Sequence, residues 1–145
     1  MNYTIIEPTT NDQWEQYYTI RYEVLRKPWN QPLSTTKDDT EGLSQHFLVV
    51  DENGNFVAAG RLQFNSTVEA QIRSMAVTKE NQGKKIGSLL VNFLEGKARE
   101  KGIQKIILDA RENAIEFYKA NGYEVYEKSY LLFNTIQHYK MSKLL

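Results

Sequence analysis

A change of hydrophobic period in the middle of the chain restricts the fold more than any other feature of the sequence. Residues 70–77 predict a strand, whereas over residues 83–101 the apolar side chains recur at helical spacing and share one face. Gly102 ends this helix as a left-handed C-terminal glycine would, and a short buried strand is expected at residues 105–110. A strand, a long helix and a strand in this order give two parallel strands joined by a right-handed crossover.

The chain ahead of this unit predicts an antiparallel meander. Residues 46–51 and 56–64 are strand-like, and the Asn53-Gly54 pair between them is the strongest short-range signal for a hairpin. A short polar turn then leads into the strand at residues 70–77. Three consecutive strands joined by short connections are expected to pair side by side.

Further elements are expected at both ends of the chain. A strand at residues 3–7 precedes a helix that starts after Thr10 or Asn11 and ends before Pro28. Asn113 can cap a second helix in the C-terminal part of the chain. The last two strands are expected over residues 124–130 and 137–140.

These elements add up to an α/β fold. We expect a single domain over residues 1–145, with a mixed, mostly antiparallel sheet of about seven strands, flanking helices and a central parallel pair. A chain of 145 residues with 41% hydrophobic residues can bury one core.

Composition removes several functional classes. The sequence has no cysteine, which excludes disulfides, a thiolate nucleophile and a thiolate zinc site, and we expect no bound metal. Eighteen basic residues balance eighteen acidic ones, so no net field attracts nucleic acid or an anionic membrane. No apolar run approaches the roughly 20 residues of a membrane helix, and residues 1–7 contain no signal-peptide core. We therefore expect a cytoplasmic protein with neither a nucleic-acid nor a membrane partner.

The turn between the strand at residues 70–77 and the long helix is a candidate phosphate site. The segment Gln82–Ser88 contains Gly83 and Gly87, which let the backbone approach a ligand closely. The first amides of a helix have no internal partner and carry partial positive charge, so they stabilise a pyrophosphate. Taken alone, the turn is also compatible with an ordinary solvated helix start. The patterns G-x-G-x-x-G and G-x-x-x-x-G-K-(S/T) are both missing from the sequence.

Two segments carry a resemblance to a known family. The first is Gln82-Gly83-Lys84-Lys85-Ile86-Gly87, and the second is Asn113-Ala114-Ile115-Glu116-Phe117-Tyr118-Lys119-Ala120-Asn121-Gly122-Tyr123. Their order and spacing resemble the GNAT (Gcn5-related) N-acetyltransferase superfamily, whose phosphate motif is (R/Q)-x-x-G-x-(G/A), over nearly the entire chain. The resemblance implies the acyl-CoA N-acyltransferase fold and an enzyme that uses acetyl-CoA as co-substrate to acetylate a small-molecule or peptide amine.

The sequence departs from the family pattern at two points. Lys85 stands where the phosphate motif has glycine, and Asn113 and Ala114 are adjacent, whereas the family separates these two positions. The Lys85 amide can still donate to phosphate if its dihedral angles are helical, as suits a residue other than glycine. Its ammonium can attract phosphate and its bulk can narrow the site, so the effect on coenzyme affinity is open in either direction.

The resemblance also implies which residues contact the coenzyme. In the family, the strand at residues 70–77 parts from the next parallel strand, and the pantetheine arm pairs with its backbone as an added strand would. The turn takes the pyrophosphate, and the second segment lies near the thioester. The implied contacts are Met75, Ala76, Val77, Gln82, Gly83, Lys84, Lys85, Ile86, Gly87, Ser88, Asn113 and Tyr118.

Acetyl transfer to an amine needs groups that move protons. By the resemblance, Tyr118 is the acid that protonates the leaving thiolate, the alternative being a core aromatic side chain. His46 and His138 are candidates for the base because imidazole titrates near neutrality, and Glu69 is a third candidate because it precedes the coenzyme strand. Each of these three also fits a purely structural or solvated role. The residues expected to meet the acceptor are Tyr22, Trp29 and Arg73.

Two other functional classes stay open. One is a non-catalytic acyl-CoA-binding sensor or interaction module, which Lys85 favours and Tyr118 opposes. The other is a small RNA-binding α/β domain, which the neutral charge balance opposes. Exposed strand edges are compatible with a homodimer.

Overall fold

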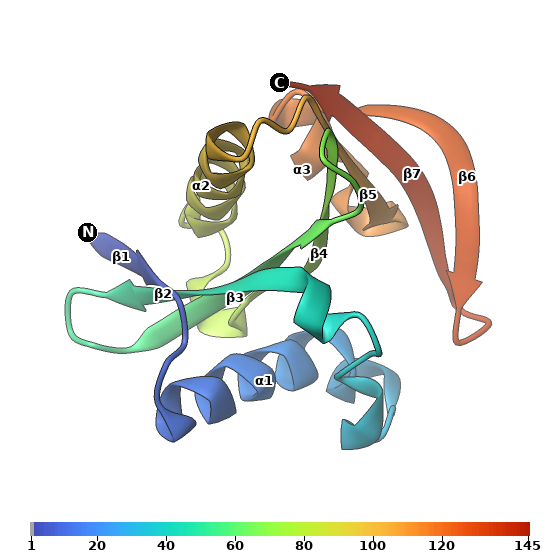
Figure 1. Ribbon diagram of the computed structural model, residues 1–145. Coiled ribbons are helices and arrows are strands. Elements are labelled where there is room, and N and C mark those ends of the chain that lie inside the picture. The colour runs from blue at the N-terminus through green and yellow to red at the C-terminus, as the bar shows by residue number, and fades with distance from the viewer. Residues whose placement is uncertain (1) are drawn as a thin grey trace.

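Seven strands form one mixed sheet in the computed structural model, which describes residues 2–145 (Figure 1). The strands are β1 Tyr3–Ile6, β2 Ser44–Asp51, β3 Phe56–Phe64, β4 Glu69–Val77, β5 Lys105–Arg111, β6 Glu124–Leu132 and β7 Ile136–Leu144. They lie in the order β1-β2-β3-β4-β5-β7-β6, and every pair of neighbours is antiparallel except β4 and β5. The predicted α/β fold, with about seven strands and one central parallel pair, is confirmed.

Helices cover both faces of this sheet. Helix α1 (Asn11–Leu25) packs on one face, and α2 (Ile86–Glu100) and α3 (Ile115–Ala120) pack on the other (Figure 1). Short 3-10 turns complete the chain: η1 Lys27–Trp29, η2 Leu33–Thr35, η3 Glu41–Leu43, η4 Lys79–Asn81 and η5 Glu112–Ala114. Within residues 2–145, no helix has the length and apolar character needed to cross a membrane.

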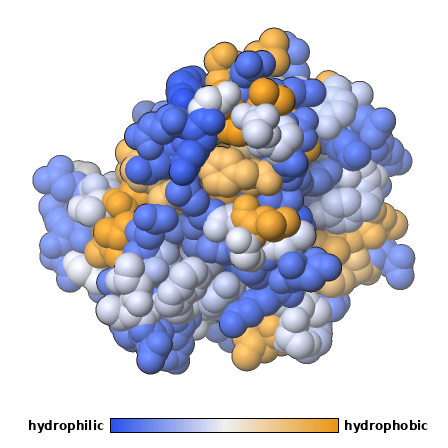
Figure 2. Space-filling view, in the orientation of Figure 1, coloured by the Kyte–Doolittle hydropathy of each residue, from blue (hydrophilic) through white to orange (hydrophobic). Residues whose placement is uncertain are grey.

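Strand β2 shows how the sheet separates two apolar layers. Phe47 and Val49 belong to the larger cluster with α2 and α3, whereas Leu48 between them belongs to the smaller cluster with α1. The surface on the side drawn in Figure 1 is mostly hydrophilic, and hydrophobic residues show there in separate small groups (Figure 2). Because a one-residue slip would move each side chain to the opposite layer, the two layers together fix the register of the central strands.

Strands β4 and β5 pair at one end and separate at the other. In the described chain, their parallel pairing joins residues 69–71 to residues 105–107 and goes no further. Strand β4 then continues to Val77 and β5 to Arg111 without pairing to each other. This separation leaves one edge of β4 without a strand partner in the middle of the sheet.

A bulge in β4 increases the separation. The register between β3 and β4 shifts opposite the segment from Ala59 to Arg61, and Ser74 of β4 has a positive φ of 53°. A bulge bends and twists its strand locally, so it turns the second half of β4 away from β5.

Thr10, one of the two predicted caps, begins α1. Its hydroxyl accepts a hydrogen bond from the Gln13 amide, while the Gln13 side-chain oxygen accepts one from the Thr10 amide. This reciprocal pair is a capping box. Helix α2 begins at Ile86 rather than at Gly83 as predicted, because the chain first makes the 3-10 turn η4 and two steps with positive φ.

The predicted cap of the second helix was wrong. Asn113 lies within η5, and α3 begins two residues later, at Ile115, with Ala114 as its N-cap. No side-chain hydrogen bond caps α3 within residues 2–145. The reason is that β5 extends to Arg111, so the chain needs the tight turn of η5 before it can start a helix.

We predict that Gly60→Ala lowers the free energy of unfolding by about 1–3 kcal/mol, because β3 approaches α2 too closely for a side chain. A Cβ at Gly60 would lie 2.8 Å from Leu90 Cδ2 and 3.0 Å from Met75 Sδ. Urea denaturation measures the change. The matched control is Gly96→Ala in α2, where an added Cβ meets no atom within 4 Å, and which should stabilise the protein by up to about 1 kcal/mol. Equal stability of both variants would contradict the close packing of β3 on α2.

Candidate active site

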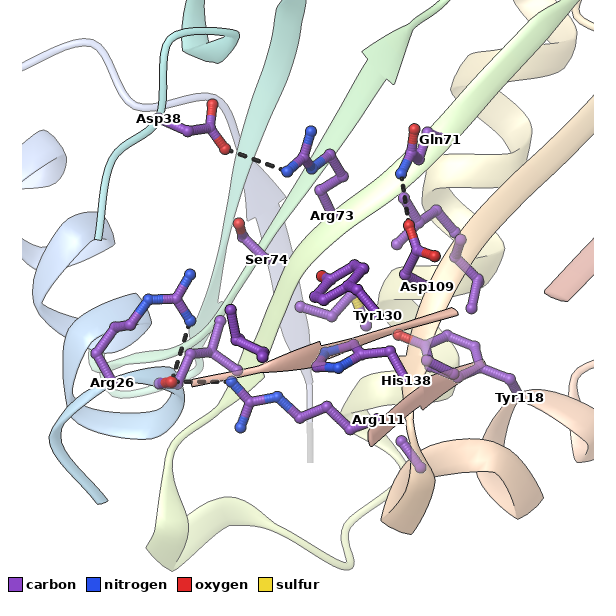
Figure 3. Close-up of a pocket in the computed structure, with 17 residues that line it drawn as sticks. Arg26, Asp38, Gln71, Arg73, Ser74, Asp109, Arg111, Tyr118, Tyr130 and His138 are labelled. Carbon is purple, nitrogen blue, oxygen red and sulfur yellow. Dashed lines mark hydrogen bonds and ion pairs between the residues drawn. The ribbon is translucent and has the colours of Figure 1, made fainter. Parts of the chain in front are cut away.

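A cavity of about 450 Å³ lies where β4 and β5 separate (Figure 3). Its walls come from β4, β5, the C-terminal end of α1, the helix α3 and the hairpin of β6 and β7. Both polar and apolar side chains line it, and its volume is within the range of small-molecule sites. The cavity is therefore a direct product of the strand separation.

Tyr118 reaches this cavity from α3 (Figure 3). Its ring packs edge-to-face on Phe117 and Tyr123, with centroid distances of 4.9 and 5.9 Å. Burial raises the pKa of the Tyr118 hydroxyl above its usual value, and the charge of Arg111 only partly opposes this. The hydroxyl thus stays protonated at neutral pH and can donate a hydrogen bond to a group in the cavity.

His138 enters the cavity from β7 and is buried. Its Nδ1 lies 2.9 Å from the carbonyl oxygen of Ile136, which can only accept, so Nδ1 carries the proton in the neutral ring. The ring stacks on Tyr130 with a centroid distance of 4.4 Å. Burial lowers the pKa of His138 below its usual value, with the Ile136 contact opposing. The neutral imidazole therefore has Nε2 as a basic nitrogen at pH 7.

Strand β5 adds two charged side chains to the same cavity, Asp109 and Arg111. The Asp109 carboxylate accepts hydrogen bonds from Ser129 Oγ at 2.6 Å and from Gln71 Nε2 at 3.3 Å. Arg111 donates to the carbonyl oxygen of Leu25 at 2.8 Å. The cavity thus contains groups of both charge signs, supplied by alternate positions of one strand.

A network of charges centred on the buried Arg21 and Arg61 holds the segment 34–43 against the sheet beside the cavity. Arg61 is fully buried and donates to the two carboxylate oxygens of Asp38 at 2.7 and 2.9 Å and to Glu41 at 2.9 Å. Arg21 binds both oxygens of Glu41, at 2.6 and 2.9 Å. Burial opposes the ionisation of Asp38, but its hydrogen bonds, led by that from Arg61, hold its pKa below the usual range. Because each of these charges is paired, the network has a structural role.

The start of α2 presents four amides without a protein partner. Within residues 2–145, the amides from Lys85 to Ser88 make no hydrogen bond to backbone or side chain, and no side chain caps the helix. Gly87 is packed against α3, since an added Cβ would lie 3.0 Å from Phe117 Cζ. Gly83, with a φ of 81°, turns the chain toward this helix start. A row of amides at a helix start fits a pyrophosphate.

Lys85 does not have the helical dihedral angles that were the condition for its amide to donate to phosphate, although that amide is free of protein partners within residues 2–145. Lys85 is left-handed, with φ 65° and ψ 17°, and forms the N-cap of α2. The left-handed conformation favours glycine because a Cβ is strained there. Lysine thus replaces the glycine of the family motif at a position whose backbone has a positive φ, which glycine adopts without strain.

Four of the predicted acceptor, coenzyme and catalytic residues line the cavity: Arg73, Met75, Tyr118 and His138. Ala76 and Val77 follow on the same strand, toward α2. Arg73 Nη2 also lies 3.4 Å from Asp38 Oδ2, and this ion pair limits where the Arg73 guanidinium can move.

Apart from the strand residues Ala76 and Val77 and the turn Gln82–Ser88, five further candidates lie outside the cavity lining, namely Tyr22, Trp29, His46, Glu69 and Asn113. Both ring nitrogens of His46 are engaged, with the Tyr17 hydroxyl at 2.7 Å and the Glu41 carbonyl oxygen at 2.8 Å. Trp29 lies in η1 and Glu69 at the far end of β4, where β4 and β5 are still paired. These residues do not enter the mechanism that we propose below.

Sequence reasoning missed several residues that line the cavity, including Arg26, Asp109, Arg111 and Tyr130. A signal for two of them was present in β5, where Asp109 and Arg111 alternate with the buried Leu108 and Ala110. Two charges at alternate positions of a central strand indicate a face that does not belong to the core.

Comparison with known proteins gives the family. The model of the acetyltransferase (GNAT) family matches residues 8–123. The uncharacterized N-acetyltransferase YjcF of Bacillus subtilis is 30% identical over 132 residues, which cover 91% of this chain and 93% of the relative. The glucosamine 6-phosphate N-acetyltransferase of Candida albicans is 29% identical over 135 residues, which cover 75% of this chain and 91% of that relative. The chain belongs to the GNAT acetyltransferase family and is an acetyltransferase.

Solved structures agree with this fold. A GNAT family acetyltransferase of Elizabethkingia anophelis, solved with acetyl-CoA bound, superimposes with a TM-score of 0.80 at 14% identity, and 99% of each chain is covered. At this identity the similarity concerns the fold, and it supports the acyl-CoA N-acyltransferase architecture implied by the sequence.

We predict that Lys85→Gly raises the free energy of unfolding by about 1 kcal/mol, because glycine removes the left-handed strain. Urea denaturation measures this change. Lys85→Ala is the matched control, since it removes the ammonium but keeps the Cβ and its strain, and it should leave stability within about 0.5 kcal/mol of the unmodified protein. If Lys85→Ala stabilised the protein as much as Lys85→Gly, side-chain charge rather than backbone strain would be the cause.

Proposed function

We propose that the protein is an acetyl-CoA-dependent N-acetyltransferase that moves an acetyl group to a primary amine of a small molecule or peptide. One observation carries this proposal: the separation of β4 from β5 brings Tyr118 and His138 to one cavity. The unpartnered amides at the start of α2 follow the same strand β4 in sequence. Strand β4 thus connects the candidate binding site for the acetyl donor with the candidate site of proton transfer.

The residues present fit coenzyme A. The amides from Lys85 to Ser88 would bind the pyrophosphate, and the unpaired edge of β4 at residues 75–77 would pair with the pantetheine arm. The acetyl-CoA found in the Elizabethkingia anophelis relative supports the same co-substrate for this chain. An aminoglycoside 6'-N-acetyltransferase solved with coenzyme A, which has a TM-score of 0.79 at 16% identity, supports it as well.

In the proposed reaction, bound acetyl-CoA supplies the activated acetyl thioester. His138 Nε2 accepts a proton from the amine, whose nitrogen forms a bond to the acetyl carbon as the carbon–sulfur bond breaks. The Tyr118 hydroxyl donates a proton toward the departing sulfur. A backbone amide on the unpaired edge of β4 near Ala76 or Val77 would stabilise negative charge on the acetyl oxygen.

We predict that Tyr118→Phe lowers kcat by about 100-fold or more while the Kd of coenzyme A changes by less than about threefold. The reason is that the hydroxyl acts on the departing sulfur, whereas the ring packing on Phe117 and Tyr123 is kept. Thiol release measures kcat and calorimetric titration measures Kd. Tyr126→Phe, at an exposed position of β6, is the matched control and should leave both unchanged. Unchanged turnover of Tyr118→Phe would remove Tyr118 from the mechanism.

We predict that kcat/KM falls as the pH falls through a value below 6.5, the usual pKa of histidine. The direction follows from burial, which lowers the pKa of His138, so the base is lost only when the medium is acidic enough to protonate it. In His138→Asn, kcat/KM should fall by about 100-fold, and the inflection below pH 6.5 should disappear. Any inflection above pH 7 that comes from the acceptor amine should remain. If kcat/KM of His138→Asn still fell at the same acidic pH as in the unmodified protein, His138 would not be the base.

These measurements also separate the enzyme from the alternative of a coenzyme-binding sensor. A sensor would bind coenzyme A tightly and release no thiol with any amine tested. Strained Lys85 in the phosphate turn is the feature that favours it, whereas the protonated Tyr118 and the basic His138 in one cavity favour turnover.

A further inference from the structure

Two arginines meet at one backbone oxygen on the floor of the cavity. Arg26 Nη1 and Arg111 Nη2 both donate to the carbonyl oxygen of Leu25, at 3.1 and 2.8 Å (Figure 3). One side chain follows the end of α1 and the other ends β5, so residues 85 positions apart in sequence bring two positive charges together. Two like charges this close repel each other, and an anion bound to both would offset that repulsion.

The described part of the chain supplies no such anion. Neither Arg26 nor Arg111 forms an ion pair with a carboxylate in residues 2–145, whereas Arg21 and Arg61 both do. Burial lowers the pKa of Arg26 and of Arg111, and for Arg111 the charge of Arg26 adds to this effect. The pair thus places two positive charges at the cavity without a carboxylate in direct contact, and for Arg26 the charge of Asp38 offers a partial offset.

Most of the donors on these guanidinium groups are uncommitted. Each guanidinium has five N–H donors. Arg111 uses one nitrogen, toward Leu25, and Arg26 uses two, toward Leu25 and the Thr35 carbonyl oxygen at 3.0 Å. Asp38, an acidic neighbour, already binds Arg61 through both of its oxygens. Donors thus remain for a ligand that brings its own negative charge.

We infer that the acceptor is an amine that also carries an anionic group, a carboxylate or a phosphate, which binds between Arg26 and Arg111. This inference rests on the proposed function and narrows its acceptor to one chemical class. Planar guanidinium groups bind carboxylate and phosphate oxygens in pairs, so two of them select such a group over a neutral one.

The register of the sheet sets the distance from this site to the base. Arg111 and His138 are direct partners of β5 and β7, so their side chains leave the same face of the sheet from adjacent positions. An acceptor with its anion on Arg111 would therefore have the rest of its molecule beside His138. Asp109, two residues before Arg111 on the same face, has no cationic partner in residues 2–145 and can attract the amine as an ammonium.

A purely structural role for the two arginines is the competing explanation. Cationic side chains often hydrogen-bond the last carbonyls of a helix, and Leu25 is the last residue of α1. Such a role predicts that replacing either arginine lowers stability and affects every acceptor equally. An anion site predicts instead a loss that depends on the charge of the acceptor.

The test compares matched acceptors by thiol release in the presence of acetyl-CoA. L-amino acids are compared with their amides to probe carboxylate, and glucosamine 6-phosphate is compared with glucosamine to probe phosphate. We expect kcat/KM to favour the acidic member of at least one pair by about 10- to 100-fold. In Arg111→Gln and Arg26→Gln this preference should fall to about threefold or less, through KM, with the neutral member unaffected. Arg99→Gln, at an exposed position of α2, is the control and should keep the preference.

Two outcomes would overturn the inference. One is equal kcat/KM for the acidic and neutral members of every pair, and the other is an equal loss for both members in the arginine variants. If coenzyme A binds and no amine is acetylated, the proposed function fails, and the inference is decided by calorimetric titration of the coenzyme complex with the same compounds. Binding of an acidic member that Arg111→Gln abolishes would support the anion site, and absence of such binding would overturn it.

Discussion

The parallel pairing of β4 with β5 is short, and this shortness creates the space for the cavity. Three residue pairs join the two strands, and beyond them β4 has a free edge in the middle of the sheet. Apolar clusters pack on both faces of the sheet, and the bulge at Ser74 directs β4 away from β5. The cavity, the unpaired backbone and the turn into α2 all follow from this one separation.

Charge pairing distinguishes the structural side chains from those that we place in the mechanism. Arg21 and Arg61 are deeply buried, and both bind carboxylates of the segment 34–43. Their pairing offsets the cost of burial and fixes that segment beside the cavity. Arg26 and Arg111 have no such partners among residues 2–145, and they line the cavity. A charge that the fold leaves unpaired in a cavity is available to a ligand.

The sequence predicted the local parts of this account and missed those that depend on contacts between distant segments. Hydrophobic period is local, so the strands around α2, their parallel pairing and the turn that leads into α2 could be predicted, whereas phosphate binding at that turn stays a prediction. The left-handed conformation of Lys85 could not be predicted from the sequence, because residues other than glycine disfavour left-handed dihedral angles. His46 and His138 were equal candidates in the sequence. The pairing of β5 with β7 brings His138 beside Arg111, and this contact between distant segments cannot be predicted from local sequence. The hydrogen bonds that occupy His46 come from Tyr17 in α1 and Glu41 in η3, which are also distant in the sequence. Asn113 failed as a cap because the length of β5 is set by its partner β7 rather than by local sequence.

We propose that the separated strands and the start of α2 form one coenzyme site. Amide correlation spectra of nitrogen-15-labelled protein, recorded while coenzyme A is added, locate the residues that contact the coenzyme. We expect the largest shifts at the amides from Lys85 to Ser88 and at residues 75–77 of β4, with little change along β1. Shifts confined to a different hollow of the surface, which Asp51, Asn55 and Lys84 help to line, would contradict a coenzyme site between the strands.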